Sequence, residues 1–269
     1  MAEKKTKKIV SADTGEVVEA GSRKKTAAAP VGNAAGLRWG AVGLWVLAIA
    51  FEVVAYLMLI GTINLTFMPT LTQIIIVLVL DLVCVIIGAQ LWKKSNRIKP
   101  ASETNKLKFW LWTNMGVIAC AVAFLPFVIL ALVNKETDKK TKTIAVVVAV
   151  IALLIGGVAS YDFDPVSVEE QQAAMAAIAD DVYWSPFGKV YHTHDDCQSL
   201  NQSDELTYGT VEQAIAANRT RLCSFCAKKD SITGVVTDDK AVDDVVVEDA
   251  VEDVAEEVVE DPAEEEDAA

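Results

Sequence analysis

Four long apolar segments constrain this chain more than any other feature of its sequence. Short polar stretches separate the segments, which cover approximately residues 39–63, 71–92, 109–133 and 144–161. A membrane core of roughly 30 Å requires about 20 apolar residues in a helix that rises 1.5 Å per residue. The first three segments meet that length, and the fourth is at the short end of the range that can span a membrane. Four such segments in succession exclude a single water-soluble domain of 269 residues and predict an α-helical membrane protein with four transmembrane helices.

Tryptophans lie at the ends of these segments. Trp39 begins the first, Trp92 ends the second, and Trp110 and Trp112 begin the third. Indole rings favour the headgroup depth of a bilayer. The sequence therefore predicts a four-helix transmembrane domain over residues 37–161, inserted in the cell membrane.

Basic residues near the segment ends predict the orientation. Lysines and arginines are numerous before the first segment and between the second and third, whereas residues 61–70 hold none. The positive-inside rule then predicts a cytoplasmic N-terminus, and four spans return the C-terminal region to the cytoplasm. The segment between the third and fourth spans disagrees with this placement, because it holds Lys135, Lys139, Lys140 and Lys142. An extracellular C-terminal region is therefore the alternative.

Two acidic residues interrupt the apolar segments. Glu52 lies in the first and Asp81 in the second, and these neighbouring spans contain no Lys, Arg or His that could pair with them. A carboxylate at this depth costs at least about 2.5 kcal/mol, so we expect at least one of the two to be protonated. The favoured interpretation is a neutral, hydrogen-bonded acid that orders helix packing, with Thr113, Asn114 or a backbone carbonyl as its partner. The alternative is an ion or proton site.

The two ends of the chain have opposite charge. Residues 230–269 carry a net charge of −16 against −13 for the whole chain, so the residues before them carry +3. Dense like charges without aromatic residues predict a disordered acidic tail over residues 230–269. Residues 1–36 are polar and lysine-rich, which predicts a disordered basic arm. The polyanionic tail argues against a nucleic-acid partner.

A small α+β module follows the last apolar segment. Residues 162–180 are expected to form a linking helix, with acidic Glu169 and Glu170 near its start. Within residues 181–229, a hairpin over 182–192, a strand near 206–208 and a helix near 211–217 capped by Thr210 are predicted.

The module concentrates the metal-binding residue types of the chain. It holds both histidines and three of the five cysteines, namely His192, His194, Cys197, Cys223 and Cys226. The two-residue gap between Cys223 and Cys226 lets both sulfurs reach one ion, and Cys197 with one histidine completes a Cys3His set. Soft ligands favour Zn²⁺ over Mg²⁺ or Ca²⁺. A module of about 48 residues is too small to be stable on its apolar core alone, so the metal is expected to supply much of its folding free energy.

The motif also resembles a known kind of module. The string Val182-Tyr183-Trp184, Gly188 to His192, Cys197, Thr210-Val211 and Leu222 to Cys226 resembles the zinc-binding modules appended to bacterial nucleases and envelope proteins, and is similar to the metal-binding domain of Ada-type repair proteins. The resemblance implies His192, Cys197, Cys223 and Cys226 as ligands. Four residues separate His192 from Cys197, where the family more often has three, so His194 stays a rival ligand. The four spans resemble bacterial four-helix membrane proteins of unassigned role.

Three functions remain open at this point. The first is a polytopic membrane protein that tethers a structural zinc module and has a binding or interaction role. Its partner would be a protein that binds the module or the tail, and oligomerisation is possible. The second is a small transporter or ion-conducting protein that uses Glu52 and Asp81. The third is a membrane-bound thiol oxidoreductase at Cys223 and Cys226. Because the sequence shows no nucleophile–base pair or phosphate-binding loop, an enzyme is the least supported class.

Overall fold

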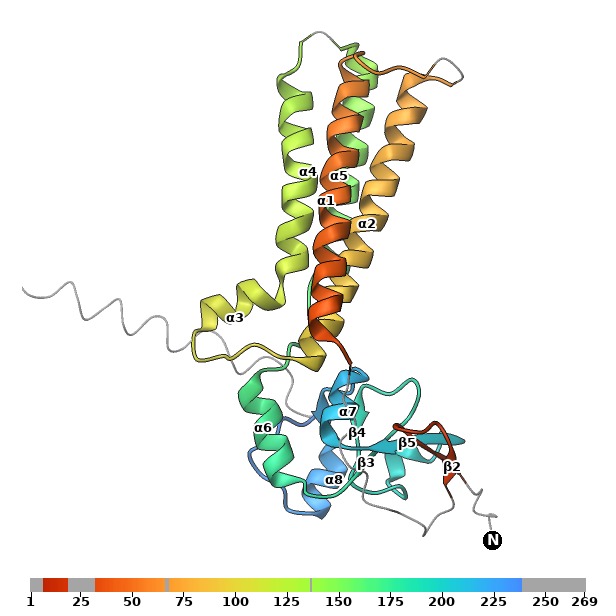
Figure 1. Cartoon of the computed structure of the whole chain (residues 1–269), viewed down its shortest axis with the longest axis vertical. Coiled ribbons are helices and arrows are strands. Elements are labelled where there is room, and N and C mark those ends of the chain that lie inside the picture. The colour runs from red at the N-terminus through yellow and green to blue at the C-terminus, as the bar shows by residue number, and fades with distance from the viewer. Residues whose placement is uncertain (1–6, 19–31, 66–67, 136, 239–269) are drawn as a thin grey trace, which may run out of the picture.

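The computed structural model describes residues 7–18, 32–65, 68–135 and 137–238, and it consists of a bundle of long helices on top of a small α+β module (Figure 1). Four helices form the bundle: α1 Ala34–Leu59, α2 Thr70–Ile98, α4 Met115–Val133 and α5 Lys139–Ser160. All four are long and apolar enough to cross a membrane, which confirms the number of apolar helices predicted from the sequence.

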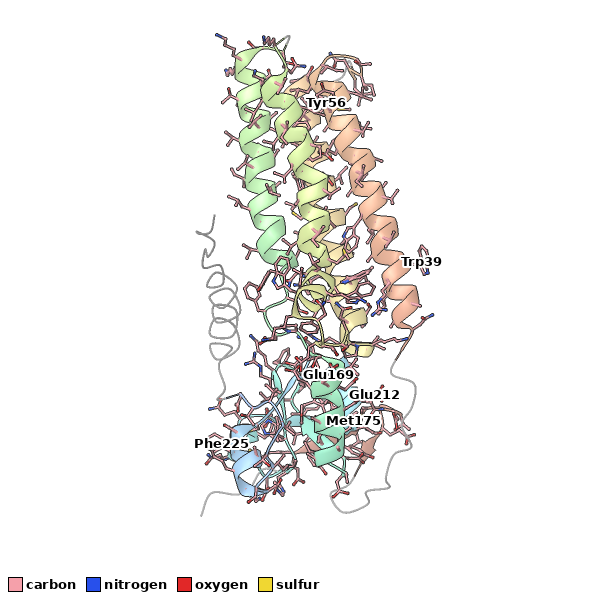
Figure 2. The ribbon with its side chains drawn as sticks, turned by 90° about the vertical axis from the view of Figure 1, so that its left-hand side faces the viewer. Trp39, Tyr56, Glu169, Met175, Glu212 and Phe225 are labelled. Carbon is pink, nitrogen blue, oxygen red and sulfur yellow. The ribbon has the colours of Figure 1, made fainter. Side chains whose placement is uncertain are left out.

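Small side chains form much of the bundle interior. Ala48 of α1, Ala145 and Ala149 of α5 are fully buried, together with Phe124 and Phe127 of α4. Bulky aliphatic side chains project outward instead, and Figure 2 shows Trp39 pointing away from the foot of α1. Alanines in the interior allow close helix contact, as is usual for helices surrounded by lipid.

The third apolar segment departs from the sequence prediction. Its first part forms a separate helix, α3 Lys106–Thr113, which turns away from the axis of α4 (Figure 1). The break occurs at Asn114, whose backbone is not helical and whose side-chain amide bonds the carbonyl of Trp110. Side chains that bond the nearby backbone compete with the helical hydrogen bonds. Trp110 and Trp112 therefore belong to α3 and not to the start of the third spanning helix.

The module contains short elements in close succession. They are α6 Val168–Ala177, β3 Val182–Trp184, β4 Val190–Tyr191, the 3₁₀ turn η1 Gln198–Leu200, β5 Glu205–Gly209, α7 Val211–Ala216, β6 Arg221–Leu222 and α8 Ser224–Lys229. The expected strands and the helix after Thr210 are present, and the Thr210 side chain accepts the N–H of Gln213 at the start of α7. Helix α8, which follows Cys223, was not foreseen.

The N-terminal residues contribute two strands to the module. Strand β1 Lys8–Ser11 pairs in parallel with β5, and β2 Val17–Val18 pairs antiparallel with β1, which gives the sheet order β2-β1-β5-β3. The prediction of a disordered arm is therefore wrong for residues 8–11 and 17–18. Ile9 is buried in the module core, so burial of an apolar side chain stabilises a segment that is otherwise polar.

This sheet also relates the two ends of the bundle. Because β1 precedes α1 and β5 follows α5, both lie on the same side of any membrane that the four helices cross. An arrangement with the module opposite to the N-terminus is incompatible with this pairing. The prediction of a disordered tail is also wrong for residues 230–238, where Leu222 of β6 forms backbone hydrogen bonds with Val236 and Asp238. The rest of the predicted tail, residues 239–269, lies outside the described residues, as do residues 1–6 and 19–31 of the basic arm.

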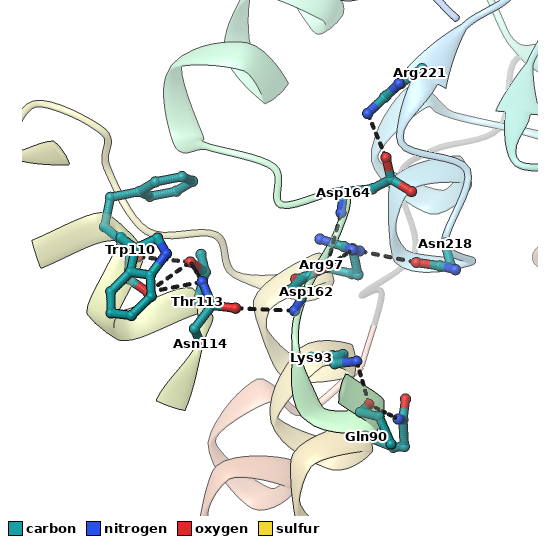
Figure 3. Close-up of polar contacts among 12 residues, drawn as sticks. Gln90, Lys93, Arg97, Trp110, Thr113, Asn114, Asp162, Asp164, Asn218 and Arg221 are labelled. Atoms are coloured by element: carbon teal, nitrogen blue, oxygen red, sulfur yellow. Dashed lines mark hydrogen bonds and ion pairs between the residues drawn. The ribbon is translucent and has the colours of Figure 1, made fainter. Parts of the chain in front are cut away.

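Buried polar contacts attach the bundle to the module (Figure 3). The Arg97 guanidinium at the end of α2 lies 2.7 Å from the Asp162 carboxylate, and both side chains are almost fully buried. Arg97 also donates to Asn218 Oδ1 at 3.0 Å, and the backbone N–H of Asp162 donates to Asn114 Oδ1 at 3.1 Å. Asn218 itself adopts a left-handed conformation after α7, with φ of +65°, which asparagine tolerates well.

Candidate metal centre

Four side chains of the module converge on one point. The ligand atoms of His192, Cys197, Cys223 and Cys226 all lie within 4.8 Å of one another, and all four residues are buried. The structure thus brings together the set that the sequence analysis grouped. The other two cysteines, Cys84 and Cys120, lie in α2 and α4, away from this cluster.

Two parallel strands position the first pair of ligands. Strands β4 and β6 pair in the register Tyr191 with Leu222, and His192 and Cys223 are the next residues on each. The N–H of Cys223 donates to the Tyr191 carbonyl at 2.9 Å, and His192 exchanges two 2.7 Å backbone hydrogen bonds with Tyr183 of β3. Because neighbouring residues in register share one face of a sheet, the imidazole and the thiol lie next to each other.

Two short helical elements position the other pair. Cys197 is the residue before η1, and its carbonyl accepts the N–H of Leu200 at 2.9 Å. Cys226 lies in the first turn of α8, which begins directly after Cys223. The helical turn therefore brings the sulfurs of Cys223 and Cys226 toward the same side, as the two-residue gap predicts.

The distances between ligand atoms fit a tetrahedral ion. The sulfurs of Cys197 and Cys223 are 3.9 Å apart, and Cys226 Sγ lies 3.8 Å from His192 Nδ1. A tetrahedron with Zn–S bonds of about 2.3 Å has edges of about 3.8 Å. The sulfurs of a disulfide are about 2.05 Å apart, so the distance between Cys197 and Cys223 is nearly twice the length of that covalent bond. The four side chains could therefore hold a metal ion with all four positions supplied by the protein.

Burial determines the charge state of the ligands without metal. Desolvation lowers the pKa of His192 to about 4, so its imidazole is neutral at pH 7 and keeps a lone pair for a metal. Burial raises the pKa of the Cys223 thiol, while hydrogen bonds from the N–H groups of Cys226 and Phe225 act in the opposite direction. A divalent cation at the centre would outweigh the desolvation and deprotonate the coordinating thiols.

A supporting contact that the sequence analysis missed involves Ser199. Its hydroxyl lies 3.8 Å from Cys223 Sγ and comes from η1, the same turn that follows Cys197. Hydroxyl and amide donors to a coordinating sulfur fix its orientation and tune its basicity. Serine residues are common in loops, so nothing in the sequence distinguishes this one.

The rival ligand His194 lies outside the cluster. Its Nε2 is 2.7 Å from the Asp230 carboxylate, which also accepts the hydroxyl of Thr193 at 2.5 Å. Both histidine and aspartate are partly exposed. Two residues beyond His192 the chain has left the β4–β6 pairing, so the His194 side chain contacts the end of α8 instead of the ligand cluster.

The Glu52 carboxyl forms a hydrogen bond inside the bundle, although its partner is not one of the groups expected from the sequence. Its Oε1 accepts the backbone N–H of Phe127 at 2.7 Å. Phe127 follows Pro126, which lies within α4. A proline lacks its own N–H and disturbs the hydrogen bonds of the preceding turn, so nearby backbone groups need other partners. The Glu52 carboxyl supplies one, whereas Thr113 and Asn114 bond elsewhere.

Asp81 is different. Its side chain is fully buried, and within the described part of the chain neither carboxyl oxygen has a hydrogen-bond partner. It lies near enough to Glu52 for the two carboxyl groups to interact electrostatically. A buried acid without a partner is costly and requires a neutral state or a bound ion.

Comparisons with family models, with curated proteins and with solved structures find no match to this chain. The resemblance to Ada-type modules therefore depends on the motif residues alone. What the fold itself establishes is a bundle of four apolar helices joined to a module with a His/Cys cluster that could bind a metal.

Proposed function

We propose that this chain is a polytopic membrane protein that holds one structural Zn²⁺ in a cytoplasmic module, through His192, Cys197, Cys223 and Cys226. The observation that carries the proposal is the convergence of four buried ligand atoms within 4.8 Å. Three sulfurs and one nitrogen at tetrahedral spacing favour zinc among the divalent ions. The module then serves as a binding platform for a protein partner at the membrane surface.

Burial of the ligands argues for a structural ion over a catalytic one. The exposed fractions of Cys223, Cys226 and His192 are at most 2%. A catalytic zinc keeps an open position for water or substrate, and four protein ligands leave none. A thiol oxidoreductase needs a partly exposed cysteine, and such a mechanism also gives no role to His192 and Cys197. We therefore assign no enzymatic activity to the cluster.

Metal analysis of the full chain, purified in detergent, tests the proposal. We expect one zinc per chain in the native protein and in His194→Ala, and less than about a tenth of that in Cys226→Ser. Native protein without zinc, or zinc loss in His194→Ala equal to that in Cys226→Ser, would overturn the assignment.

Thiol labelling tests the orientation. A membrane-impermeant reagent should leave the module cysteines of intact cells unmodified, with or without chelator. After lysis it should modify them only when a chelator is present. Labelling in intact cells treated with a chelator would place the module outside the cell.

The second candidate function is a proton or cation site at Asp81 and Glu52. The specific observation in its favour is the Asp81 carboxyl, which is fully buried and lacks a hydrogen-bond partner among the described residues. Ion flux into liposomes that contain the purified chain tests it. Loss of flux in Asp81→Asn, with retention in Cys84→Ser one turn along α2, supports a conducting role. Absence of flux in the native chain leaves the acid pair as a packing feature.

A further inference from the structure

A cleft lies where the foot of the bundle meets the module, away from the metal cluster. Its volume is about 680 Å³, and its walls come from the end of α2, from the segment after α5 and from the module. The lining includes Lys93, Lys94, Arg97, Phe163 and Lys189. Four cationic side chains from two distant parts of the sequence thus line one cavity (Figure 3 shows Lys93 and Arg97).

Most of the negative charge at this cleft is already neutralised. The two acidic residues in its wall are Asp162, which pairs with Arg97 at 2.7 Å, and Asp164, which pairs with Arg221. Lys93 donates to the carbonyl of Ala159, a neutral acceptor, at 2.9 Å. The charges of three lysines therefore remain available to a ligand.

Two of these lysines have no partner among the residues that the structure describes. Lys94 and Lys189 are exposed, and no hydrogen bond or ion pair engages either ammonium group in the described part of the chain. Lys94 comes from α2 and Lys189 from the turn before β4, so only the docking of the module onto the bundle brings both to one cleft. Such a cluster of cations attracts an anion with several oxygen atoms.

With the bundle inserted in a membrane as proposed, the cleft would lie at the depth of lipid headgroups. Lys93 and Lys94 follow directly after Trp92, where the apolar part of α2 ends. In the segment after α5, which also lines the cleft, Phe163 is 62% exposed and its ring lies 4.8 Å from that of Tyr161. Aromatic rings beside basic residues at the end of a spanning helix are typical of the membrane–water interface.

We propose that this cleft binds the phosphate group of an anionic phospholipid headgroup, through Lys93, Lys94 and Lys189. The inference rests on the proposed insertion of the bundle in a membrane. The lipid would contact the bundle and the module together and would stabilise the way in which the module docks at the membrane surface.

Native mass spectrometry of the detergent-purified full chain tests the inference. The probes are dioleoyl phosphatidylglycerol, dioleoyl phosphatidylcholine and inorganic phosphate. We expect selective retention of phosphatidylglycerol, and a loss of affinity of about fivefold for each lysine removed in Lys94→Gln and Lys189→Gln. The matched control is Lys139→Gln with Lys140→Gln, two exposed lysines at the far end of the bundle, which should retain the lipid.

The outcomes distinguish a lipid from a soluble phosphate as the ligand. They also distinguish failure of the proposed site from failure of the proposed membrane insertion. Displacement of phosphatidylglycerol by millimolar inorganic phosphate would overturn the lipid assignment in favour of a soluble phosphate. Equal retention of both lipids, or equal losses in the cleft variants and the control pair, would overturn the site itself. Release of the chain from membranes by alkaline carbonate would instead contradict the proposed membrane insertion, which is measured separately from lipid selectivity.

Discussion

The bundle and the module of this protein differ in how many of their large aliphatic side chains are exposed. In the bundle, Val158 is 67% and Leu154 64% exposed, while Ala145 and Ala149 are fully buried. In the module the largest buried side chains are bulky, and they include Tyr191, Leu200, Leu206, Ile215 and Leu222. Large side chains such as Phe124 and Phe127 are buried in the bundle as well, so the difference lies in the many aliphatic side chains that the bundle exposes.

The difference is the one expected if the bundle faces lipid, as proposed above, and the module faces water. In water, burial of large apolar side chains is the main favourable term in folding, so they gather in the interior. In lipid the outside is as apolar as the inside, so large side chains face outward and small ones allow close helix contact. The module, which is small, adds four metal-ligating side chains to its apolar core. The two regions should therefore respond differently to the same kind of perturbation.

Metal removal should distinguish the two regions most strongly. A zinc chelator is expected to unfold the module and leave the bundle helical, because structural zinc contributes about 10–16 kcal/mol in small modules, which matches or exceeds typical domain stability. Limited proteolysis and circular dichroism of the full chain in detergent measure this. Cys84→Ser, a change in α2, serves as the control and should behave as the native chain. A module that resists proteolysis after complete zinc removal would show that its apolar core is sufficient.

The buried ion pair that joins the regions should have the next largest effect. Arg97→Ala leaves the buried Asp162 carboxylate without its partner at 2.7 Å, at an expected cost of about 3–5 kcal/mol. The expected signs are a lower thermal unfolding midpoint and faster protease cleavage between α5 and α6. Lys99→Ala, which removes an exposed cation directly after the same helix, should change stability by less than about 0.5 kcal/mol. Similar effects of the two substitutions would contradict a structural role for the pair.

Strand β1 should behave as part of the module core. Ile9→Ala removes a buried side chain and should destabilise the module by about 2–4 kcal/mol, whereas Val17→Ala, at a site that is 60% exposed, should cost little. Hydrogen exchange of the β5 amides measures the difference in stability between the two variants, since β1 pairs with that strand. If Ile9→Ala leaves β5 protection unchanged, then residues 8–11 do not belong to the module sheet.

Two adjacent glycines of α5 test the packing rule of the bundle. A Cβ at Gly156 would lie 2.7 Å from Cys120 Sγ, whereas a Cβ at Gly157 would meet no atom within 4 Å. Gly156→Leu should therefore cost about 1–3 kcal/mol through overpacking, while Gly157→Leu should be neutral. Thermal unfolding in detergent compares the two variants, which differ only in the face of the helix that they change. An equal loss in both would mean that α5 does not pack on α4 through this face.

The features predicted well from the sequence are those that depend on local composition. The four apolar helices follow from segment length, and the cap at Thr210 follows from a residue type next to a helix. The ligand set was grouped because Cys and His are rare in this chain and gather in one stretch. The choice between His192 and His194 could not be made locally, because it depends on the pairing of β4 with β6.

The features that were missed depend on contacts between distant residues. Strand β1 exists because Lys8 to Ser11 pair with Glu205 to Tyr208, almost 200 residues later. Helix α3 ends at Asn114, whose side chain accepts the N–H of Asp162 from the segment after α5. Glu52 accepts the Phe127 N–H of another helix beside Pro126. No pattern within a window of the sequence reports such partners.

The sequence by itself determined which segments are apolar enough to cross a membrane and which stretch holds the metal-ligating residue types. Both are properties of composition over short distances, and solvation free energy depends on them directly. Only the tertiary structure decided which four side chains meet, that the N-terminal strand completes the module sheet, and that lysines from α2 and the module share one cleft. These outcomes depend on the packing of separate elements, whose free energy is set by partners far apart in the chain.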